Sequence, residues 1–266
     1  MVRNPGREKD RRSHAGGGRV SAIIEIRDVS KAYGGVVANK DITLSVQQGA
    51  ITGLIGPNGS GKTTLFNSVV GYHPIDSGSI QFEGKEISRI HVQEIARLGL
   101  IRTFQQTRIY KAMNCVENML ISLPHRKMRF LESFSRNSTA DYENADRLLD
   151  FVGLYEKRFL KAGSLSFGQQ KLLEFAMALM NEPKALLLDE PTAGINPTLI
   201  NGLIDRLLRA NREFGITLFV IEHNMRVIMN LAQKIYCLAH GELLAEGEPE
   251  AVQNDQRVID AYLGAH

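Results

Sequence analysis

Apolar and polar residues alternate in the N-terminal third of the chain. Ile42, Leu44 and Val46 recur at every second position, which is the period of a strand with one buried face. Ser79–Phe82 is another short apolar segment, entered by an Asp-Ser-Gly turn and followed by Gly84. The pattern predicts an antiparallel β sheet in this part of the chain.

A different pattern follows, in which short apolar runs lack clean alternation. The runs are Ala50–Ile55, Ala185–Asp189 and Ile216–Ile221, and each precedes a turn and a helix-like segment. Strands that are covered by helices on both faces have this sequence pattern, so we predict an α/β fold with a mainly parallel sheet. Thr198–Phe214 has the start and stop residues of a helix, and Lys234–Glu246 is expected to form a hairpin.

Residues 88–165 differ from both patterns. They include several helix candidates, among them Val92–Leu98 and Asp141–Val152, each followed by a glycine. Leu123–Ser138 lies between these two and is basic and polar, with little periodicity. We therefore predict a helical subdomain over about residues 88–165, inserted into one α/β domain that spans residues 22–266.

Charge is distributed unevenly along the 266 residues. Residues 1–20 contain six basic and two acidic side chains, a balance of +4, whereas the whole chain carries +3, which leaves −1 for the remainder. Because the residues after the first 20 are nearly neutral overall, nucleic acid is not expected to be the main ligand. Residues 1–21 are predicted to be a disordered basic tail, with a contact to anionic lipid or nucleic acid as the alternative.

Composition excludes several classes of protein. Hydrophobic residues make up 43% of the chain and charged residues 23%, the usual proportions of a folded domain. Two cysteines, Cys115 and Cys237, are too few for a disulfide scaffold or a multi-cysteine zinc site. The longest strictly apolar run is Phe175–Met180, whereas a membrane-spanning helix needs about 20 residues. With no apolar segment of a secretory signal near its start, the protein is expected to be cytoplasmic.

One run of residues fits the phosphate-binding pattern G-x-x-x-x-G-K-[ST] in full. It consists of Gly56, Pro57, Asn58, Gly59, Ser60, Gly61, Lys62 and Thr63. The run follows an expected strand and opens an amphipathic helix, so its backbone N–H groups and the helix N-terminus can face phosphate oxygens. Lys62 is predicted to reach the β- and γ-phosphates and Thr63 to ligate Mg²⁺, with Thr64 beside them at the nucleotide.

Two carboxylates end the apolar strand Ala185–Asp189. A nucleotidase with a phosphate loop needs one carboxylate to hold Mg²⁺ and often a second one to activate water. Asp189 is predicted to have the first role and Glu190 the second.

The segment Leu165–Gln170 contains a third motif. Its local role is to start a helix, with Ser166 as the cap. Placed between the phosphate loop and Asp189, it resembles the signature motif of ABC-type ATPases, and this resemblance covers about residues 22–265. The resemblance implies that the protein hydrolyses ATP to ADP and phosphate with Mg²⁺. It also implies that three residues of the motif close the nucleotide site of an opposing subunit: Ser166, Gly168 and Gln169.

Other landmarks of ABC-type ATPases have matching residues here. Tyr33 is similar in position to the aromatic residue that stacks on adenine. His223 follows the expected strand Ile216–Ile221 and matches the histidine that contacts the γ-phosphate. The segment Ala193–Pro197 matches the loop that crosses between subunits.

A glutamine completes the implied site. Gln105 follows an expected strand over Leu100–Phe104 and matches the glutamine that senses Mg²⁺ and the attacking water, with Gln106 as the alternative. The catalytic residues implied by the resemblance are Glu190, His223, Gln105 and Lys62. The metal ligands implied in the same way are Thr63, Gln105 and Asp189.

Smaller features resemble one branch of the family. Phe167 stands where many members have glycine, and Asn196 where many have aspartate. These two residues resemble those found in the ATP-binding subunits for branched-chain amino-acid uptake. The basic insertion before residue 139 and the ending Gln256–Gly264 resemble the same subunits. The implied function is to power an importer for branched-chain or related amino acids.

The resemblance also implies partners and a location. A second ATPase subunit would complete each site. The resemblance favours a paralogue of this chain over a second copy of it. Two membrane permease subunits would contact residues 88–165 and carry the solute, which a periplasmic binding protein would deliver. The chain would therefore lie on the cytoplasmic face of the inner membrane as a peripheral subunit, and it would not itself specify the solute.

Two alternative functions remain open from the sequence. A lipopolysaccharide-export ATPase has a similar tail, but its signature favours basic and acidic residues where this chain has Gln169, Gln170 and Lys171. A soluble ABC protein of translation or DNA repair would carry two ATPase domains or a long coiled coil. This chain has one phosphate loop and no heptad repeat.

We expect residues 1–20 to be dispensable for folding and for ATP hydrolysis, because they offer few apolar side chains to bury. A chain that starts near Ser21 should melt at the same temperature as the full chain in a thermal unfolding scan. A large drop in melting temperature after the truncation would contradict this expectation.

Overall fold

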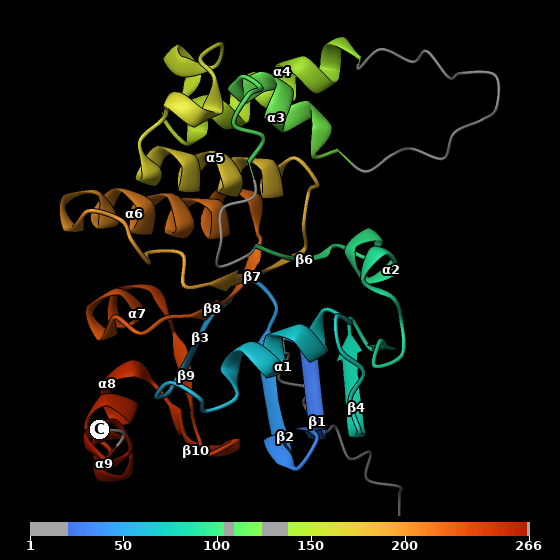
Figure 1. Ribbon diagram of the computed structural model, residues 1–266, viewed down its shortest axis with the longest axis vertical. Helices are drawn as coiled ribbons and strands as arrows, with labels where there is room; N and C mark the ends of the chain where they lie inside the picture. The colour runs from blue at the N-terminus through green and yellow to red at the C-terminus, as the bar shows by residue number, and fades with distance from the viewer. Residues whose placement is uncertain (1–20, 104–108, 124–137, 265–266) are drawn as a thin grey trace, which may run out of the picture.

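The computed structural model describes residues 21–103, 109–123 and 138–264 (Figure 1). The predicted tail falls almost entirely outside these residues. Gln105, Gln106 and most of the basic segment Leu123–Ser138 also lie outside them.

An antiparallel sheet forms the N-terminal part of the fold, which confirms the prediction from alternation. Its strand order is β2-β1-β4-β5, with β1 and β2 joined by a tight turn at Gly34 and Gly35. Alternate residues of β2, such as Ile42 and Val46, are fully buried. The strands are β1 (Ala22–Tyr33), β2 (Val36–Gln47), β4 (Ser77–Phe82) and β5 (Lys85–Glu86).

The second sheet is mainly parallel, again as predicted. Its order is β10-β9-β3-β8-β7-β6, and β10 alone pairs antiparallel, through the expected hairpin with β9. Every residue of β3, β7 and β8 is buried, which accounts for their unbroken apolar runs. The strands are β3 (Ile51–Ile55), β6 (Leu100–Arg102), β7 (Ala185–Asp189), β8 (Thr217–Ile221), β9 (Lys234–Ala239) and β10 (Glu242–Gly247).

Helices cover both faces of this sheet (Figure 1). On one face Phe66 of α1 packs against Phe219 of β8, with ring centroids 4.8 Å apart. On the other face Leu173 of α5 and Leu207 of α6 join the larger apolar cluster. The helices are α1 (Lys62–Val69), α2 (Val92–Arg97), α3 (Cys115–Ile121), α4 (Thr139–Phe151), α5 (Phe167–Leu179), α6 (Pro197–Phe214), α7 (Met225–Leu231), α8 (Pro249–Gln253) and α9 (Gln256–Leu263).

The segment 88–165 divides between the sheet and a helical group. β6 pairs with β7 at the edge of the parallel sheet, and α2 before it packs in the cluster under the antiparallel sheet through Ile95. The expected strand Leu100–Phe104 is observed as Leu100–Arg102 in the described residues. The helices that pack on one another are α3, α4 and α5, so the helical group starts later than residue 88 and includes part of the chain after residue 165.

Local capping explains where the helices of this region begin. Ser166 accepts a hydrogen bond from the Gln169 N–H, and the Gln169 side chain accepts one from the Ser166 N–H. This capping box starts α5 where the sequence predicts a helix. α6 begins one residue before its predicted start because Pro197 fits the first helical position, after the cap residue Asn196.

Two expectations from composition can be compared with the described residues. Cys115 and Cys237 are both buried and unpaired, in agreement with the absence of a disulfide scaffold. Across residues 21–103, 109–123 and 138–264, no helix combines the length and the apolarity that crossing a membrane requires.

Candidate active site

The phosphate loop connects the end of β3 to the start of α1 and lies at the carboxyl edge of the parallel sheet. Gly56 and Gly61 have φ angles of 145° and 98°, in the region that favours glycine. A Cβ on Gly56 would lie 2.1 Å from the Leu238 carbonyl oxygen, and one on Gly61 would lie 2.2 Å from the Ala38 carbonyl oxygen. Both glycines are therefore required by close backbone contacts as well as by conformation.

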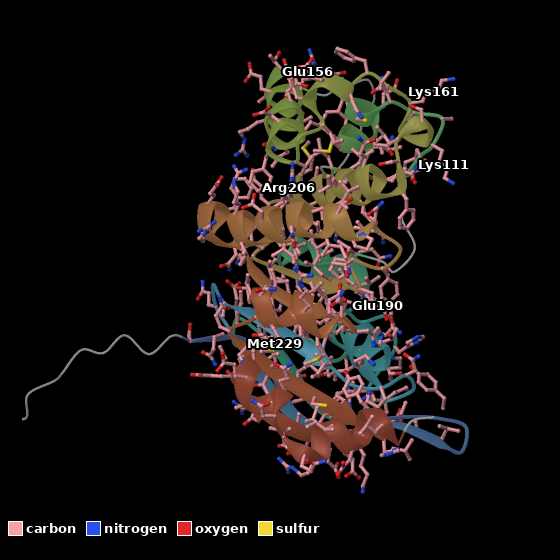
Figure 2. All side chains as sticks on the ribbon, turned by 90° about the vertical axis from the view of Figure 1, so that its left-hand side faces the viewer. Lys111, Glu156, Lys161, Glu190, Arg206 and Met229 are labelled. Carbon is pink, nitrogen blue, oxygen red and sulfur yellow. The ribbon has the colours of Figure 1, made fainter. Side chains whose placement is uncertain are left out.

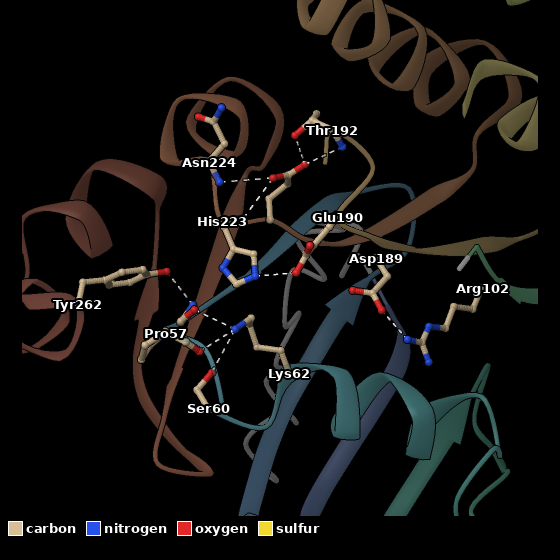
Figure 3. Close-up of polar contacts among 12 residues, drawn as sticks. Pro57, Ser60, Lys62, Arg102, Asp189, Glu190, Thr192, His223, Asn224 and Tyr262 are labelled. Carbon is tan, nitrogen blue, oxygen red and sulfur yellow. Dashed lines mark hydrogen bonds and ion pairs between the residues drawn. The ribbon is translucent and has the colours of Figure 1, made fainter. Parts of the chain in front are cut away.

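Lys62 folds back over this loop (Figure 3). Its Nζ donates hydrogen bonds to the carbonyl oxygens of Gly56, at 2.8 Å, and Pro57, at 2.9 Å. The side chain is buried, and burial lowers the pKa of Lys62, while the charges of Glu190 and Asp189 act in the opposite direction. The loop thus holds a cation whose ammonium already faces the centre of the loop.

The N-terminus of α1 is suited to an anion. Gly61 is its cap residue, and no side chain among the described residues caps its first N–H groups. The first turn holds no acidic residue that would compete for these donors. Together with Lys62 and the curled glycine backbone, these N–H groups fit the phosphates of ATP.

Asp189 ends β7 and is almost completely buried. Its Oδ2 forms an ion pair with Arg102 of β6, at 2.5 Å, and Arg102 also donates to the side chain of Asn67. Asp189 Oδ1 is buried and has no partner in the part of the chain that the structure describes. An unsatisfied carboxylate oxygen at this edge fits a divalent cation. Asp189 and the hydroxyl of the exposed Thr63, in the first turn of α1, would hold Mg²⁺. When bound, the ion would neutralise phosphate charge.

Glu190 and His223 face each other next to this carboxylate. The Nε2 atom of His223 lies 2.6 Å from Oε1 of Glu190, at the edge where β7 and β8 end. Glu190 has a φ of 50°, a conformation that costs a residue with a side chain about 1–3 kcal/mol. Its N–H donates to the Ile221 carbonyl oxygen, 3.0 Å away, which holds this backbone in place.

Glu222 connects the loops that carry Glu190 and His223. No sequence motif predicts a role for Glu222. It is only 3% exposed, and Oε1 accepts hydrogen bonds from the Thr192 N–H, at 3.0 Å, and from the Thr192 hydroxyl. Oε2 accepts from the N–H groups of His223 and Asn224. A buried carboxylate with these donors ties the loop after β7 to the loop after β8. The available signal was a charged residue directly after the mainly apolar strand Thr217–Ile221.

Tyr33 lies outside this cluster, at the end of β1. Its ring is 42% exposed and packs edge-on against His73, with the Lys31 Nζ 5.4 Å from the ring centroid. An exposed ring at the end of a hairpin can accept a stacked base. Gln105 and Gln106 fall outside the described residues, so the structure adds nothing about them.

The signature residues are not brought to the phosphate loop of their own chain. Ser166 and Gln169 bond to each other at the start of α5. Buried residues of α5 belong to the apolar cluster on one face of the parallel sheet, and those of α1 to the cluster on the opposite face. Gly168 and the 47% exposed Phe167 share the start of α5 with Ser166 and Gln169.

Comparisons with known proteins decide the family. Residues 39–193, more than half of the chain, match the family model described as ABC transporter. The chain belongs to the ABC transporter ATP-binding family. Residues 242–266 also match the model described as branched-chain amino acid ATP-binding cassette transporter.

Relatives of this ABC subunit cover nearly its whole length. It is 38% identical over 247 residues to the probable branched-chain amino acid transport ATP-binding protein LivG of Archaeoglobus fulgidus, which covers 91% of this chain and 96% of the relative. It is 36% identical over 249 residues to the high-affinity branched-chain amino acid transport ATP-binding protein BraF of Pseudomonas aeruginosa, covering 91% and 98%. These matches place the subunit in the LivG/BraF-type branch.

Solved structures agree with this assignment. A nucleotide-free ATP-binding cassette from an ABC transporter superposes with a TM-score of 0.82 at 33% identity, covering 91% of this chain and 98% of the other. A cassette in its ADP conformation gives 0.83 at 34% identity, covering 92% and 99%. The predicted fold class is thus confirmed, and as an ABC ATPase the subunit hydrolyses ATP to ADP and phosphate.

Substitutions of Lys62 and Glu190 should separate binding from chemistry. Lys62→Ala removes a buried cation from beside the phosphates, so ATP affinity should fall by about 10-fold or more. Glu190→Gln keeps the shape of the side chain and removes its charge, so turnover should fall by about 10²–10⁴-fold while ATP remains bound. Equilibrium binding of a fluorescent ATP analogue and phosphate release measure the two effects.

Matched controls exist in one exposed ion pair. Lys184 and Glu83 pair on the surface with side chains 53% and 40% exposed, and Lys184→Ala and Glu83→Gln make the same chemical changes there. Both controls should bind and hydrolyse ATP like the parent. Parent-like turnover of Glu190→Gln would show that this carboxylate has only a structural role.

Proposed function

We propose that this subunit hydrolyses ATP to drive the import of branched-chain or related amino acids through separate permease subunits. The observation that carries the proposal is the match of residues 242–266 to the branched-chain model, which is independent of the ATPase motifs. Relatives that are named as branched-chain amino acid transport proteins and cover 91% of the chain support it. Both lines of support favour this function over lipopolysaccharide export or a role outside transport.

Hydrolysis rests mainly on positioning and on charge neutralisation. Lys62 and the loop N–H groups hold the phosphates, and Glu190 polarises a water molecule toward the γ-phosphate. His223 lies within hydrogen-bond distance of Glu190 and orients this carboxylate until the γ-phosphate takes its place as partner. Gln105 contributes to sensing Mg²⁺ and water in this proposal.

Each site is completed by a second ATPase subunit. In this chain Ser166, Gly168 and Gln169 lie at the start of α5, on the sheet face opposite to α1. Ser166 is exposed at the helix start, although its hydroxyl caps α5, so a neighbouring nucleotide can reach it. This placement on the opposite sheet face supports an exchange of signatures with a paralogue or a second copy of this chain.

The permease contact is proposed on the helical group. Tyr110, Phe159 and Leu160 are 53%, 70% and 50% exposed, which is unusual for large apolar side chains. Basic residues flank them, and Figure 2 shows two of these, Lys111 and Lys161, close together at one end of the molecule. The partners are two permease subunits, reached from the cytoplasmic face of the inner membrane, with a periplasmic binding protein on the other side.

Uptake measurements test the proposed function. Cells that carry Glu190→Gln in place of the parent chain should lose energy-dependent uptake of radiolabelled leucine, isoleucine or valine, because the ATPase step is blocked. Cells with Glu83→Gln should take up these amino acids like the parent. Unchanged uptake of all three in Glu190→Gln cells, together with loss of ATPase activity in the purified variant, would reject branched-chain import and leave the ATPase assignment intact.

A further inference from the structure

The last helix of the chain contacts the first glycine of the phosphate loop. The N–H of Gly56 donates a hydrogen bond to the hydroxyl oxygen of Tyr262 at 2.8 Å, across 206 residues of sequence (Figure 3). Tyr262 belongs to α9 and lies inside the segment 242–266 that matches the branched-chain model. The ATPase motifs described above do not include it.

The packing of the C-terminal segment holds this tyrosine in place. Asp255 caps α9 by accepting a hydrogen bond from the Arg257 N–H, and Val258 is 3% exposed in the main apolar cluster. The ring of Tyr262 packs against the same cluster. Burial raises the pKa of Tyr262 to about 12, so the phenol keeps its proton at neutral pH. Its position is thus determined by the core and not by the loop.

Gly56 is held from two sides. Its N–H donates to Tyr262, and its carbonyl oxygen accepts from the Lys62 Nζ. The residue is buried, and a Cβ in its place would meet the Leu238 carbonyl oxygen. A buried N–H without a partner costs free energy, so the Tyr262 hydroxyl stabilises the observed path of the chain as it leaves β3.

We propose that Tyr262 is a positioning residue for the phosphate loop, through which the C-terminal helix of this branch raises nucleotide affinity. A loop already held in its binding conformation loses less conformational freedom when the phosphates arrive. Without the Tyr262 hydroxyl, the start of the loop samples other paths and must be ordered by the nucleotide. The effect is shared by ATP and ADP, because both present a β-phosphate to the same N–H groups.

The test is Tyr262→Phe in the full chain, which removes one oxygen atom and keeps the packed ring. ATP and ADP affinities, measured by displacement of a fluorescent nucleotide, should both weaken by about 3- to 10-fold, the range expected for one lost hydrogen bond. Amide hydrogen exchange at residues 56–61 should become faster in the nucleotide-free protein, which a change of global stability alone would not confine to this loop.

Tyr236→Phe is the matched control. The Tyr236 hydroxyl is also bonded to backbone, but its partner is Ser45 of β2, with the N–H at 3.1 Å and the carbonyl oxygen at 2.9 Å. This variant should lower the melting temperature while leaving both nucleotide affinities and the exchange of residues 56–61 as in the parent.

Three outcomes would overturn the proposal. Parent-like affinity of Tyr262→Phe for both nucleotides would show that the contact does not affect binding. An equal loss of affinity in Tyr236→Phe would show a general effect of stability. A loss restricted to ATP would place the effect at the γ-phosphate and not at the start of the loop.

Discussion

A buried lysine at the carboxyl edge of a parallel sheet is the constraint on which the site depends. Taking the Lys62 ammonium out of water is unfavourable unless nearby groups compensate for its hydration. The carbonyl oxygens of Gly56 and Pro57 do so directly, and the carboxylates of Asp189 and Glu190 act through their charge. Phosphate oxygens satisfy the same cation better than carbonyl oxygens, because they carry full negative charge.

The remaining contacts hold these charges at their mutual distances. Arg102 offsets one oxygen of Asp189, and the other oxygen is buried without a hydrogen-bond partner among the described residues. Glu222 ties together the loops that present Glu190 and His223, and so supports a strained backbone at Glu190. The chemical groups are thus positioned by buried polar contacts at the strand ends, as expected for a site that works by preorganisation.

Features encoded by short stretches of sequence could be predicted. The phosphate loop, the paired carboxylates at the end of β7 and the capped start of α5 each depend on a few consecutive residues, and the sequence predicts all three. Arg102 and Tyr262 were missed because their partners lie 87 and 206 residues away, where no local period or motif links them. The strand over Leu100–Phe104 is also predicted, but its pairing with β7 depends on residues 85 positions away, so its place at the edge of the parallel sheet could not be read from the local pattern.

The central claim is that one chain holds the phosphates and the base, while the signature that completes the site comes from another chain. Mixing two variants tests it, at an ATP concentration too low to occupy the weakened phosphate loop of Lys62→Ala. At this concentration Lys62→Ala leaves its own loop empty, and Ser166→Arg cannot complete the site of its partner. When equal amounts are mixed, about half of the randomly formed pairs contain one chain of each variant, and each such pair has one intact site out of two. Steady-state ATPase activity should therefore appear at about a quarter of the parent rate. A mixture as inactive as its components, under conditions in which the parent chain alone hydrolyses ATP, would contradict the claim.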